Sequence, residues 1–324
     1  MITSILLFAV GLVLLIKGGD WFVDGATGIA KRFNLPDIVV GATVVSIGTT
    51  LPEVMVSTTG ALAGSGAMAY GNAIGSIICN TALIAAISIT CNPGPVNVKS
   101  MKTPAVFFFC SAALYCFASY ILGEFPRWMG FVMLSIFVVY MVLTVRNGMK
   151  NPATASNEED EEGQTQNLLQ ELLLLVAGAA VIAVGADLLV DHGQIIALEL
   201  GVPETVVALL FVALGTSLPE LVTTITSLKK GRASLGVGNV IGANVFNLVL
   251  VSGVAVSLAP FPVPCENFLL DTGLNMSLVL EIPVMLGVMS LMIFPALATK
   301  KLGRWQGILL LGIYAAFCVC QFVL

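Results

Sequence analysis

Two glutamates of this 324-residue chain stand inside apolar stretches, each in the same short setting. Glu53 closes the motif GTTLPE at 48–53, and Glu220 closes GTSLPE at 215–220. An ionised side chain at the centre of a bilayer costs about 2.5–3.5 kcal/mol even on insertion scales, so such residues mark ion pathways or binding sites. Two of them in matching settings favour a binding role over a structural one.

The side chains around both glutamates offer oxygen ligands. Ser46, Thr49 and Thr50 precede Glu53 at spacings of three and four, which gathers them on one face of a helix. The prolines before the glutamates lack the N–H that would bind the carbonyls of Gly48 and Gly215. Carboxylates, hydroxyls, amides and free carbonyls suit hard cations, and two carboxylates with neutral oxygens suit the 6–8 coordination of Ca²⁺ better than Mg²⁺.

The composition places these motifs in a membrane. Hydrophobic residues make up 57% of the chain and charged residues 10%, with a mean hydropathy of +0.99, whereas soluble domains carry about 25% charged residues. The net charge of −5 comes from an acidic block at 158–162, so nucleic acid is not an expected partner. The seven cysteines show no CxxC pair and are expected to be buried small hydrophobes.

Apolar stretches long enough to cross a bilayer predict ten transmembrane helices. The first lacks a basic start and a cleavage site, so it is expected to be a retained helix rather than a signal peptide. The stretches 20–35 and 188–202 are less apolar and could extend the neighbouring helices or lie at the interface. The ten predicted spans are 2–17, 37–62, 70–90, 104–122, 128–146, 168–187, 204–228, 237–259, 282–298 and 304–323.

The basic residues predict the orientation, because Lys and Arg concentrate in short cytoplasmic loops. With the N-terminus outside, 13 of the 14 basic residues fall on the inner side and only Arg127 on the outer side. Both termini are therefore predicted to lie outside a plasma membrane.

The chain also contains an internal repeat. Residues 18–81 align without a gap on 185–248, an offset of 167, with 22 of 64 positions identical. Each copy holds five predicted spans, an odd number, so the second copy enters the membrane from the opposite side. Inverted repeats of this kind are typical of secondary transporters, whose site lies at the midplane between the halves.

The predicted organisation is thus an all-α polytopic membrane protein of ten transmembrane helices in two inverted five-helix repeats. Its predicted parts are a first repeat at 1–146 with its motif-bearing core at 37–90, an acidic cytoplasmic linker at 147–167, and a second repeat at 168–324 with its core at 204–259.

The paired motifs resemble the two alpha-repeats of the sodium/calcium exchanger (cation/calcium antiporter) superfamily, particularly its short prokaryotic members. GTTLPE is followed by GNAIGSIICN, and GTSLPE by GNVIGANVFN. The resemblance implies that helices two, three, seven and eight hold Ca²⁺ and Na⁺, while helices one and six slide across them for alternating access. It implies Glu53 and Glu220 as shared carboxylates and Thr49 and Thr216 as Ca²⁺ ligands through their carbonyls. The other positions it implies are Ser46, Thr50, Ser76, Ala213 and Ser217 as Na⁺ ligands, with Asn80 lining the centre.

Two further positions of the expected site depart from the family pattern. Asn247 stands where some relatives carry Asp, which weakens the case for K⁺ co-transport. Ala243 stands where relatives, and Ser76 in the first repeat, offer a hydroxyl, so the adjacent Na⁺ site is expected to be weaker.

The expected function is Na⁺-driven Ca²⁺ antiport across the plasma membrane, by a monomer without cofactors. Its partners are Ca²⁺, Na⁺ and the lipid bilayer. An H⁺-coupled Ca²⁺ antiporter remains open, since protons would also discharge the two glutamates, and a passive cation channel is a weaker alternative. An intramembrane protease is not expected, because the acids beside the prolines are glutamates.

Overall fold

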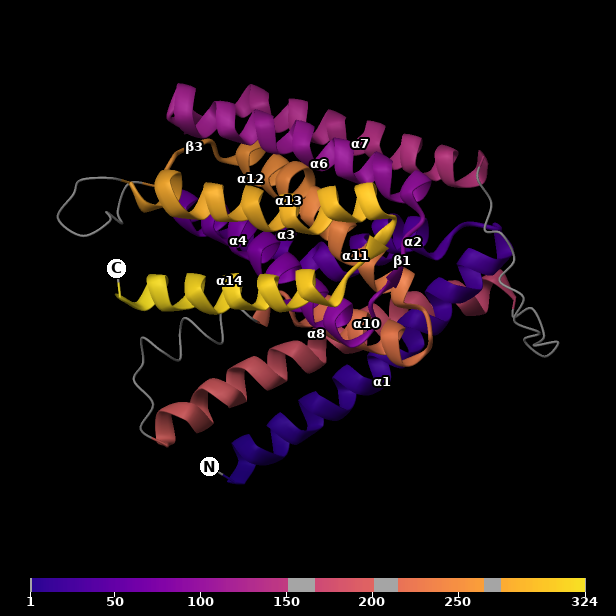
Figure 1. Cartoon of the computed structure of the whole chain (residues 1–324). Coiled ribbons are helices and arrows are strands. Elements are labelled where there is room, and N and C mark those ends of the chain that lie inside the picture. The colour runs from indigo at the N-terminus through magenta and orange to yellow at the C-terminus, as the bar shows by residue number, and fades with distance from the viewer. Residues whose placement is uncertain (1, 151–166, 201–214, 265–274, 324) are drawn as a thin grey trace.

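The computed structural model describes residues 2–150, 167–200, 215–264 and 275–323. These residues form helices joined by short connections and two small β-ribbons, as Figure 1 shows. The first half of the chain contains α1 Ile2–Arg32, α2 Asp37–Val40, η1 Gly41–Val45, α3 Ser46–Leu62, α4 Gly66–Cys79, η2 Asn80–Ala85, α5 Ala86–Cys91, β1 Gly94–Pro95, α6 Val98–Cys116, η3 Phe117–Leu122, β2 Glu124–Phe125 and α7 Arg127–Lys150. The second half contains α8 Leu168–Glu199, α10 Leu218–Lys229, α11 Ala233–Phe246, η4 Asn247–Val251, α12 Ser252–Leu258, β3 Phe261–Pro262, η6 Ser277–Glu281, α13 Ile282–Thr299, β4 Lys301–Leu302 and α14 Arg304–Val323.

Eight helices within the described residues are long and apolar enough to cross a membrane. They correspond to predicted spans one to six, eight and nine. Part of the seventh predicted span, 204–214, lies outside the described residues, and α10 forms its remainder. The tenth predicted span coincides with the helix α14, which is not among the eight. The all-helical membrane class is confirmed, and the count of ten stays a prediction.

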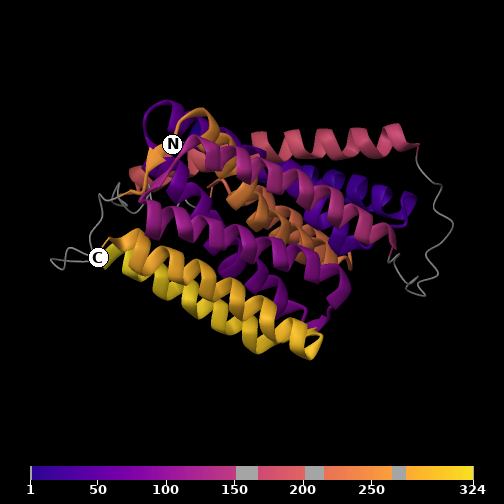
Figure 2. The same ribbon diagram turned by 90° about the horizontal axis from the view of Figure 1, so that it is seen from above.

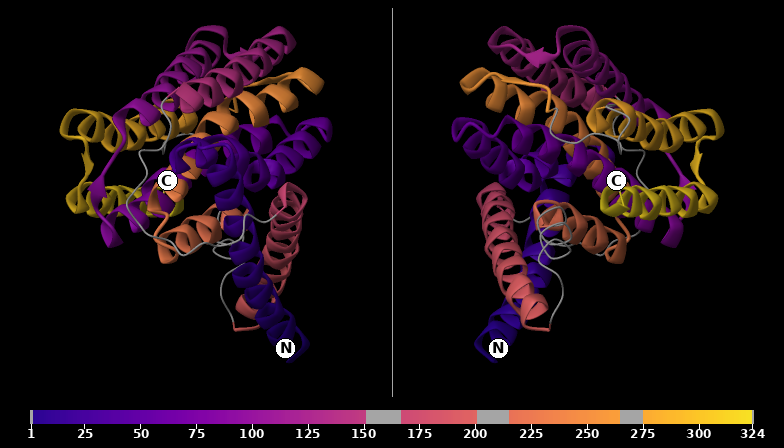
Figure 3. Two further views of the ribbon diagram at one scale, coloured as in Figure 1. Left: turned by 90° about the vertical axis from the view of Figure 1, so that its right-hand side faces the viewer. Right: turned by 90° about the vertical axis from the view of Figure 1, so that its left-hand side faces the viewer.

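The first and sixth spans are longer than predicted. Helix α1 has 31 residues and α8 has 32, so the less apolar stretches after each span continue the helix. The two helices pack antiparallel through glycines: a Cβ at Gly11 would lie 2.9 Å from the carbonyl oxygen of Gly185, and a Cβ at Gly185 2.9 Å from that of Gly11. Figure 3 shows this pair standing apart from α6, α7 and α13.

The centre of the molecule is α11 with its continuation, η4 and α12. In an 18-residue stretch of this helix, 89% of the residues are buried. Glycines let it approach the first half: a Cβ at Gly238 would meet the backbone of Ile38, and one at Gly242 would meet Ala42 and the hydroxyl of Ser46. Figure 2 shows α13 and α14 side by side along one edge of the molecule and α8 along the opposite edge.

Two ribbons connect the halves of the chain. Strand β1 pairs antiparallel with β4, and β2 pairs antiparallel with β3. Each ribbon therefore joins a strand from before residue 150 to a strand from after residue 167.

Three basic residues of the described part of the chain form ion pairs at the end of the molecule where α1 finishes and α8 begins. Arg32 Nε contacts Glu171 Oε2 at 2.9 Å, and Lys230 Nζ contacts Asp24 Oδ1 at 2.7 Å. Arg232 Nη1 contacts Asp37 Oδ2 at 3.3 Å. The turn between α10 and α11 is thereby tied to both α1 and α2.

Candidate functional site

The two motif glutamates face each other across the halves of the chain. Glu53 lies in α3 and Glu220 in the first turn of α10, and both are fully buried. Thr50 Oγ1 donates a hydrogen bond of 3.4 Å to Glu220 Oε1. The structure therefore brings together the two motifs that the sequence analysis singled out.

The backbone around the two prolines differs between the motifs. Helix α3 continues through Pro52, whereas the helical path in the second motif is interrupted by a turn at Thr216 and Ser217 before α10 begins at Leu218. Glu220 consequently lies near a helix N-terminus, whose partial positive charge favours a carboxylate.

Two asparagines line the glutamate helices from the opposite half. Asn80 starts the π-helical segment η2, which contacts α10, and Asn247 starts the π-helical segment η4, which contacts α3. Both side chains are fully buried. Helical turns of this wide type are frequent at functional sites because they displace side chains from the regular helical path.

Several buried polar atoms at this place have no hydrogen-bond partner among the described residues. They include both carboxylate oxygens of Glu53, Oε2 of Glu220, the hydroxyl of Ser217 and the amide groups of Asn80 and Asn247. Buried polar atoms are almost always paired, and an ionised carboxylate can only accept. A concentration of unpaired carboxylate, amide and hydroxyl oxygens matches the ligands that Ca²⁺ and Na⁺ prefer.

The remaining predicted ligands surround this cluster. Ser46, Thr49, Thr50, Ser76, Ser217 and Ala243 are buried, and Thr216 is half-buried. Ser46 Oγ is already engaged, since it donates to the carbonyl oxygens of Gly41 at 2.8 Å and Asn239 at 2.9 Å. Ala213 lies outside the described residues. Ala243 brings no side-chain oxygen to the site, as expected from its sequence.

Asn72 and Asn239 connect the halves, although the sequence analysis did not place them among the ligands. Thr49 Oγ1 donates to Asn239 Oδ1 at 3.1 Å, and Thr216 Oγ1 donates to Asn72 Oδ1 at 3.4 Å. These are equivalent bonds, because Thr49 and Asn72 align with Thr216 and Asn239 at the same offset of 167. The duplicated Gly-Asn pairs at 71–72 and 238–239 were the available signal.

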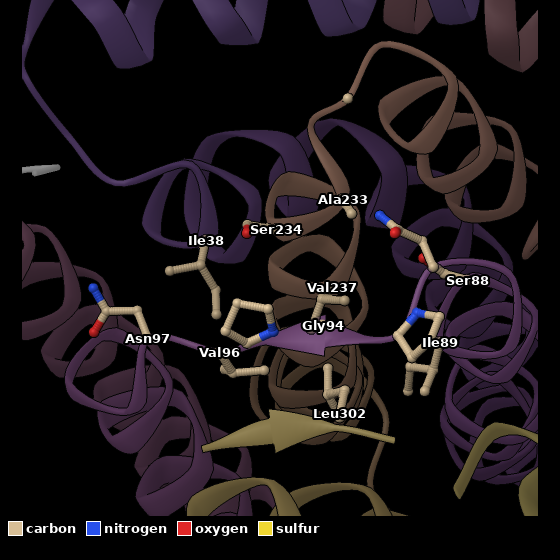
Figure 4. A pocket seen from close by; sticks show the side chains of 14 residues that line it. Ile38, Ser88, Ile89, Gly94, Val96, Asn97, Ala233, Ser234, Val237 and Leu302 are labelled. Carbon is tan, nitrogen blue, oxygen red and sulfur yellow. The ribbon is translucent and has the colours of Figure 1, made fainter. Parts of the chain in front are cut away.

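A cavity of about 270 Å³ reaches the second motif. Its wall includes Pro52, Thr216 and Pro219 beside the two glutamates, together with Asp187 and Asp191 of α8. A further cavity of about 320 Å³ lies between the turn preceding α11 and the ribbon of β1 and β4, as Figure 4 shows. None of the predicted ligands lines this further cavity.

Comparison with known proteins agrees with this geometry. The family model described as sodium/calcium exchanger protein matches residues 3–146 and 171–323. The sodium/calcium exchanger MaX1 of Methanosarcina acetivorans is 28% identical over 98% of both chains. An uncharacterised membrane protein of Methanocaldococcus jannaschii is 35% identical over 95% of this chain and 94% of its own.

A solved structure of the sodium–calcium exchanger NCX_Mj has a TM-score of 0.80 and 33% identity over 98% of both chains. In this family Ca²⁺ and Na⁺ are transported ions rather than cofactors, and the members are exchangers rather than enzymes. The chain therefore belongs to the sodium/calcium exchanger family.

Proposed function

We propose that the protein is a secondary active antiporter that exchanges Ca²⁺ for Na⁺ across the plasma membrane by alternating access. The observation that carries the proposal is the pair of fully buried glutamates, Glu53 and Glu220, with three carboxylate oxygens free of hydrogen bonds in the described part of the chain. The relatives named as sodium/calcium exchangers support the choice of ions.

The electrostatics of the site give a reason for exchange. Two buried carboxylates are costly when bare, because burial in a low-dielectric interior disfavours charge. One Ca²⁺ balances both charges, and Na⁺ ions can take its place. The protein therefore switches between its access states more readily when a cation is bound than when the site is empty. This difference couples the movement of one ion to that of the other.

The proposed ligands form two groups. Glu53 and Glu220 bind both ions, and the carbonyls of Thr49 and Thr216 complete the Ca²⁺ site. Flanking Na⁺ positions use Ser46, Thr50, Ser76, Ala213 and Ser217, while Asn80 lines the centre. Ala243 and Asn247 occupy the two positions that depart from the family pattern. The missing hydroxyl at Ala243 makes the Na⁺ position beside it the weaker of the two.

The proposed architecture is ten helices in two inverted repeats, 1–146 and 168–324, joined by a cytoplasmic linker at 147–167. Glycine contacts support it: Gly11 and Gly185 meet, and the equivalent pair Gly178 and Gly18 meet as well. The equivalent bonds of Thr49 to Asn239 and Thr216 to Asn72 support it further. A pseudo-two-fold axis between the halves accounts for both pairs of contacts.

The proposed orientation has both termini outside and one monomer as the transporting unit. The basic residues support this orientation, since 13 of 14 lie on the inner side. With this orientation, the cavity of about 270 Å³ beside Thr216 opens outward, and the ion pairs of Arg32, Lys230 and Arg232 lie on the cytoplasmic side.

The deciding experiment is ⁴⁵Ca²⁺ uptake into proteoliposomes under an imposed Na⁺ gradient, compared with a pH gradient. Uptake driven by Na⁺ is the expected result. Uptake driven only by the pH gradient would replace Na⁺ by H⁺ as the coupling ion, and passive uptake along the Ca²⁺ gradient alone would refute antiport.

The carboxylates are tested in the same assay. Glu53→Gln and Glu220→Gln should each abolish exchange while the protein stays folded, since each removes one of the two charges that balance Ca²⁺. Glu124→Gln is the matched control, because Glu124 is an exposed carboxylate in the ribbon strand β2. Near-normal exchange by either motif variant would remove that glutamate from the mechanism.

A further inference from the structure

The equivalent asparagines Asn72 and Asn239 make different hydrogen bonds. Asn72 Nδ2 donates to the main-chain carbonyl of Glu53 at 3.2 Å and to Ser57 Oγ at 2.8 Å. Asn72 thus holds the turn that carries the glutamate of its own half. Its bond to the opposite half, from Thr216, is long at 3.4 Å.

Asn239 bonds through its oxygen to the opposite half, and its amide nitrogen makes no bond within its own half among the described residues. Its Oδ1 accepts from a hydroxyl of the opposite half, that of Thr49 at 3.1 Å. Its Nδ2 has no acceptor among the described residues, although the side chain is fully buried. The hydroxyl of Thr224, which aligns with Ser57, is also buried and unpaired.

In the second half, the two groups that would form the equivalent of the Asn72–Ser57 bond are both present but do not bond to each other. The bond from Asn72 to Ser57 has its equivalent in Asn239 Nδ2 and Thr224 Oγ1. An unpaired buried donor or acceptor is destabilising, so a conformation that pairs them is favoured at this place. The asymmetry coincides with the backbone, since α3 is continuous and the second motif is interrupted at Thr216 and Ser217.

In a transporter with inverted repeats, the two access states arise when the halves exchange conformations. We propose that Asn72 and Asn239 are paired positioning residues that exchange hydrogen-bond partners between the two access states. In the outward-open state each makes the bonds described above. In the inward-open state Asn239 donates to the carbonyl of Glu220 and to Thr224, while Asn72 releases Glu53 and Ser57 and keeps its bond from Thr216, which shortens.

This inference rests on the proposed alternating access, and it assigns a task to residues that do not touch the ions. In the state described above, Asn72 holds the helical turn of Glu53 and thereby fixes that carboxylate. Asn239 leaves the turn of Glu220 unheld, beside the cavity. Ser57 and Thr224 then stabilise opposite states, because each pairs in only one of them.

The test measures the Ca²⁺ KM on each face of oriented proteoliposomes. Each face's apparent KM is inversely proportional to the population of the state open to that face, so the ratio of inner to outer KM follows the equilibrium between the states. One hydrogen bond changes such an equilibrium by about fivefold. Ser57→Ala should therefore lower the ratio about fivefold, and Thr224→Val should raise it about fivefold.

Three further variants separate positioning from general damage. Ser57→Thr and Thr224→Ser keep the hydroxyl and should return the ratio to the wild-type value. Thr223→Val removes a buried hydroxyl that donates to the carbonyl of Pro219 in its own helix, at 2.7 Å, and should leave the ratio unchanged.

Shifts of both variants in the same direction, or no shift in either, would overturn the proposal. Failure of antiport itself is recognised separately, because the wild-type protein would then show no Na⁺-driven ⁴⁵Ca²⁺ flux. If a variant transports too poorly for a KM to be measured, the labelling rate of a cysteine on the cavity wall reports the population of the outward-open state instead. A Gln194→Cys reporter on the cavity wall should react with an impermeant maleimide more slowly alongside Ser57→Ala than alongside Thr224→Val, without any need for transport. Equal labelling rates would refute the exchange of partners.

Discussion

Gly238→Ala tests how closely the two halves of the protein must approach. A methyl group at this position would lie 2.8 Å from Cα and 2.9 Å from the carbonyl carbon of Ile38, with the carbonyl oxygen of Ile38 closer still. These are backbone atoms, so no side chain can rotate away. Ordinary contact begins at 3.4 Å, which requires α2 and α11 to separate by at least 0.6 Å, the difference between 3.4 and 2.8 Å.

The same displacement reaches the site through Asn239, the next residue. If α2 and α3 move together, the bond from Thr49 Oγ1 to Asn239 Oδ1 lengthens from 3.1 to about 3.7 Å, and that from Ser46 Oγ to Asn239 O from 2.9 to about 3.5 Å, beyond the range of useful hydrogen bonds. Overpacking costs about 1–3 kcal/mol, and the two weakened bonds cost about 1 kcal/mol each. The helix preference of alanine over glycine returns about 1 kcal/mol.

The net loss of unfolding free energy is therefore about 2–4 kcal/mol, which corresponds to a fall in Tm of about 4–8 °C for a chain of this size. The assay is thermal unfolding in detergent, followed by the Ca²⁺ KM in proteoliposomes, which should rise. Gly287→Ala is the control, because this exposed glycine of α13 has no atom within 4 Å of the added methyl. A Gly238→Ala protein with the Tm and KM of the control would refute the close contact of α2 and α11.

Three other outcomes are expected. Ala243→Ser adds the hydroxyl that Ser76 supplies in the first repeat, so it should lower the half-saturating Na⁺ concentration severalfold without changing the Ca²⁺ KM; an unchanged Na⁺ dependence would contradict a Na⁺ position there. Lys230→Gln should change the Tm by no more than about 2 °C, because the side chain of its partner Asp24 is 55% exposed and such pairs contribute under about 1 kcal/mol. Arg32→Gln should lower the Tm more than Lys230→Gln does, because it removes the ion-pair partner of Glu171, whose side chain is only 6% exposed. The double variant Arg32→Gln/Glu171→Gln should recover the loss in Tm. Equal Tm values for the two single variants would contradict this order.

The sequence predicted the elements that depend on local signals. The second span, 37–62, coincides with the range from α2 to α3, since Pro36 precedes its start and Gly64, with φ of +85°, follows its end. The repeated motifs identified Glu53 and Glu220, because a buried carboxylate is conspicuous in an apolar stretch. Both glutamates are fully buried, and their place at the membrane midplane stays a prediction.

Features that depend on distant partners could not be read from local patterns. Helix α1 continues past Lys17 and Asp20 because its polar end is held by the other half, with Asp24 paired to Lys230. The bond of Thr49 to Asn239 spans 190 residues, so no spacing within one helix predicts it. The π-helical segments at Asn80 and Asn247 have no residue pattern that distinguishes them from ordinary helix.

The two ribbons have a consequence for how the protein can be divided. Strands β1 and β2 belong to the first half of the chain, and their partners β4 and β3 belong to the second. Either half alone would leave two strand edges without partners, and unpaired edges recruit other chains. Under the proposed architecture of two inverted repeats, a gene for one half would therefore encode a chain that needs the other half to pair its strands.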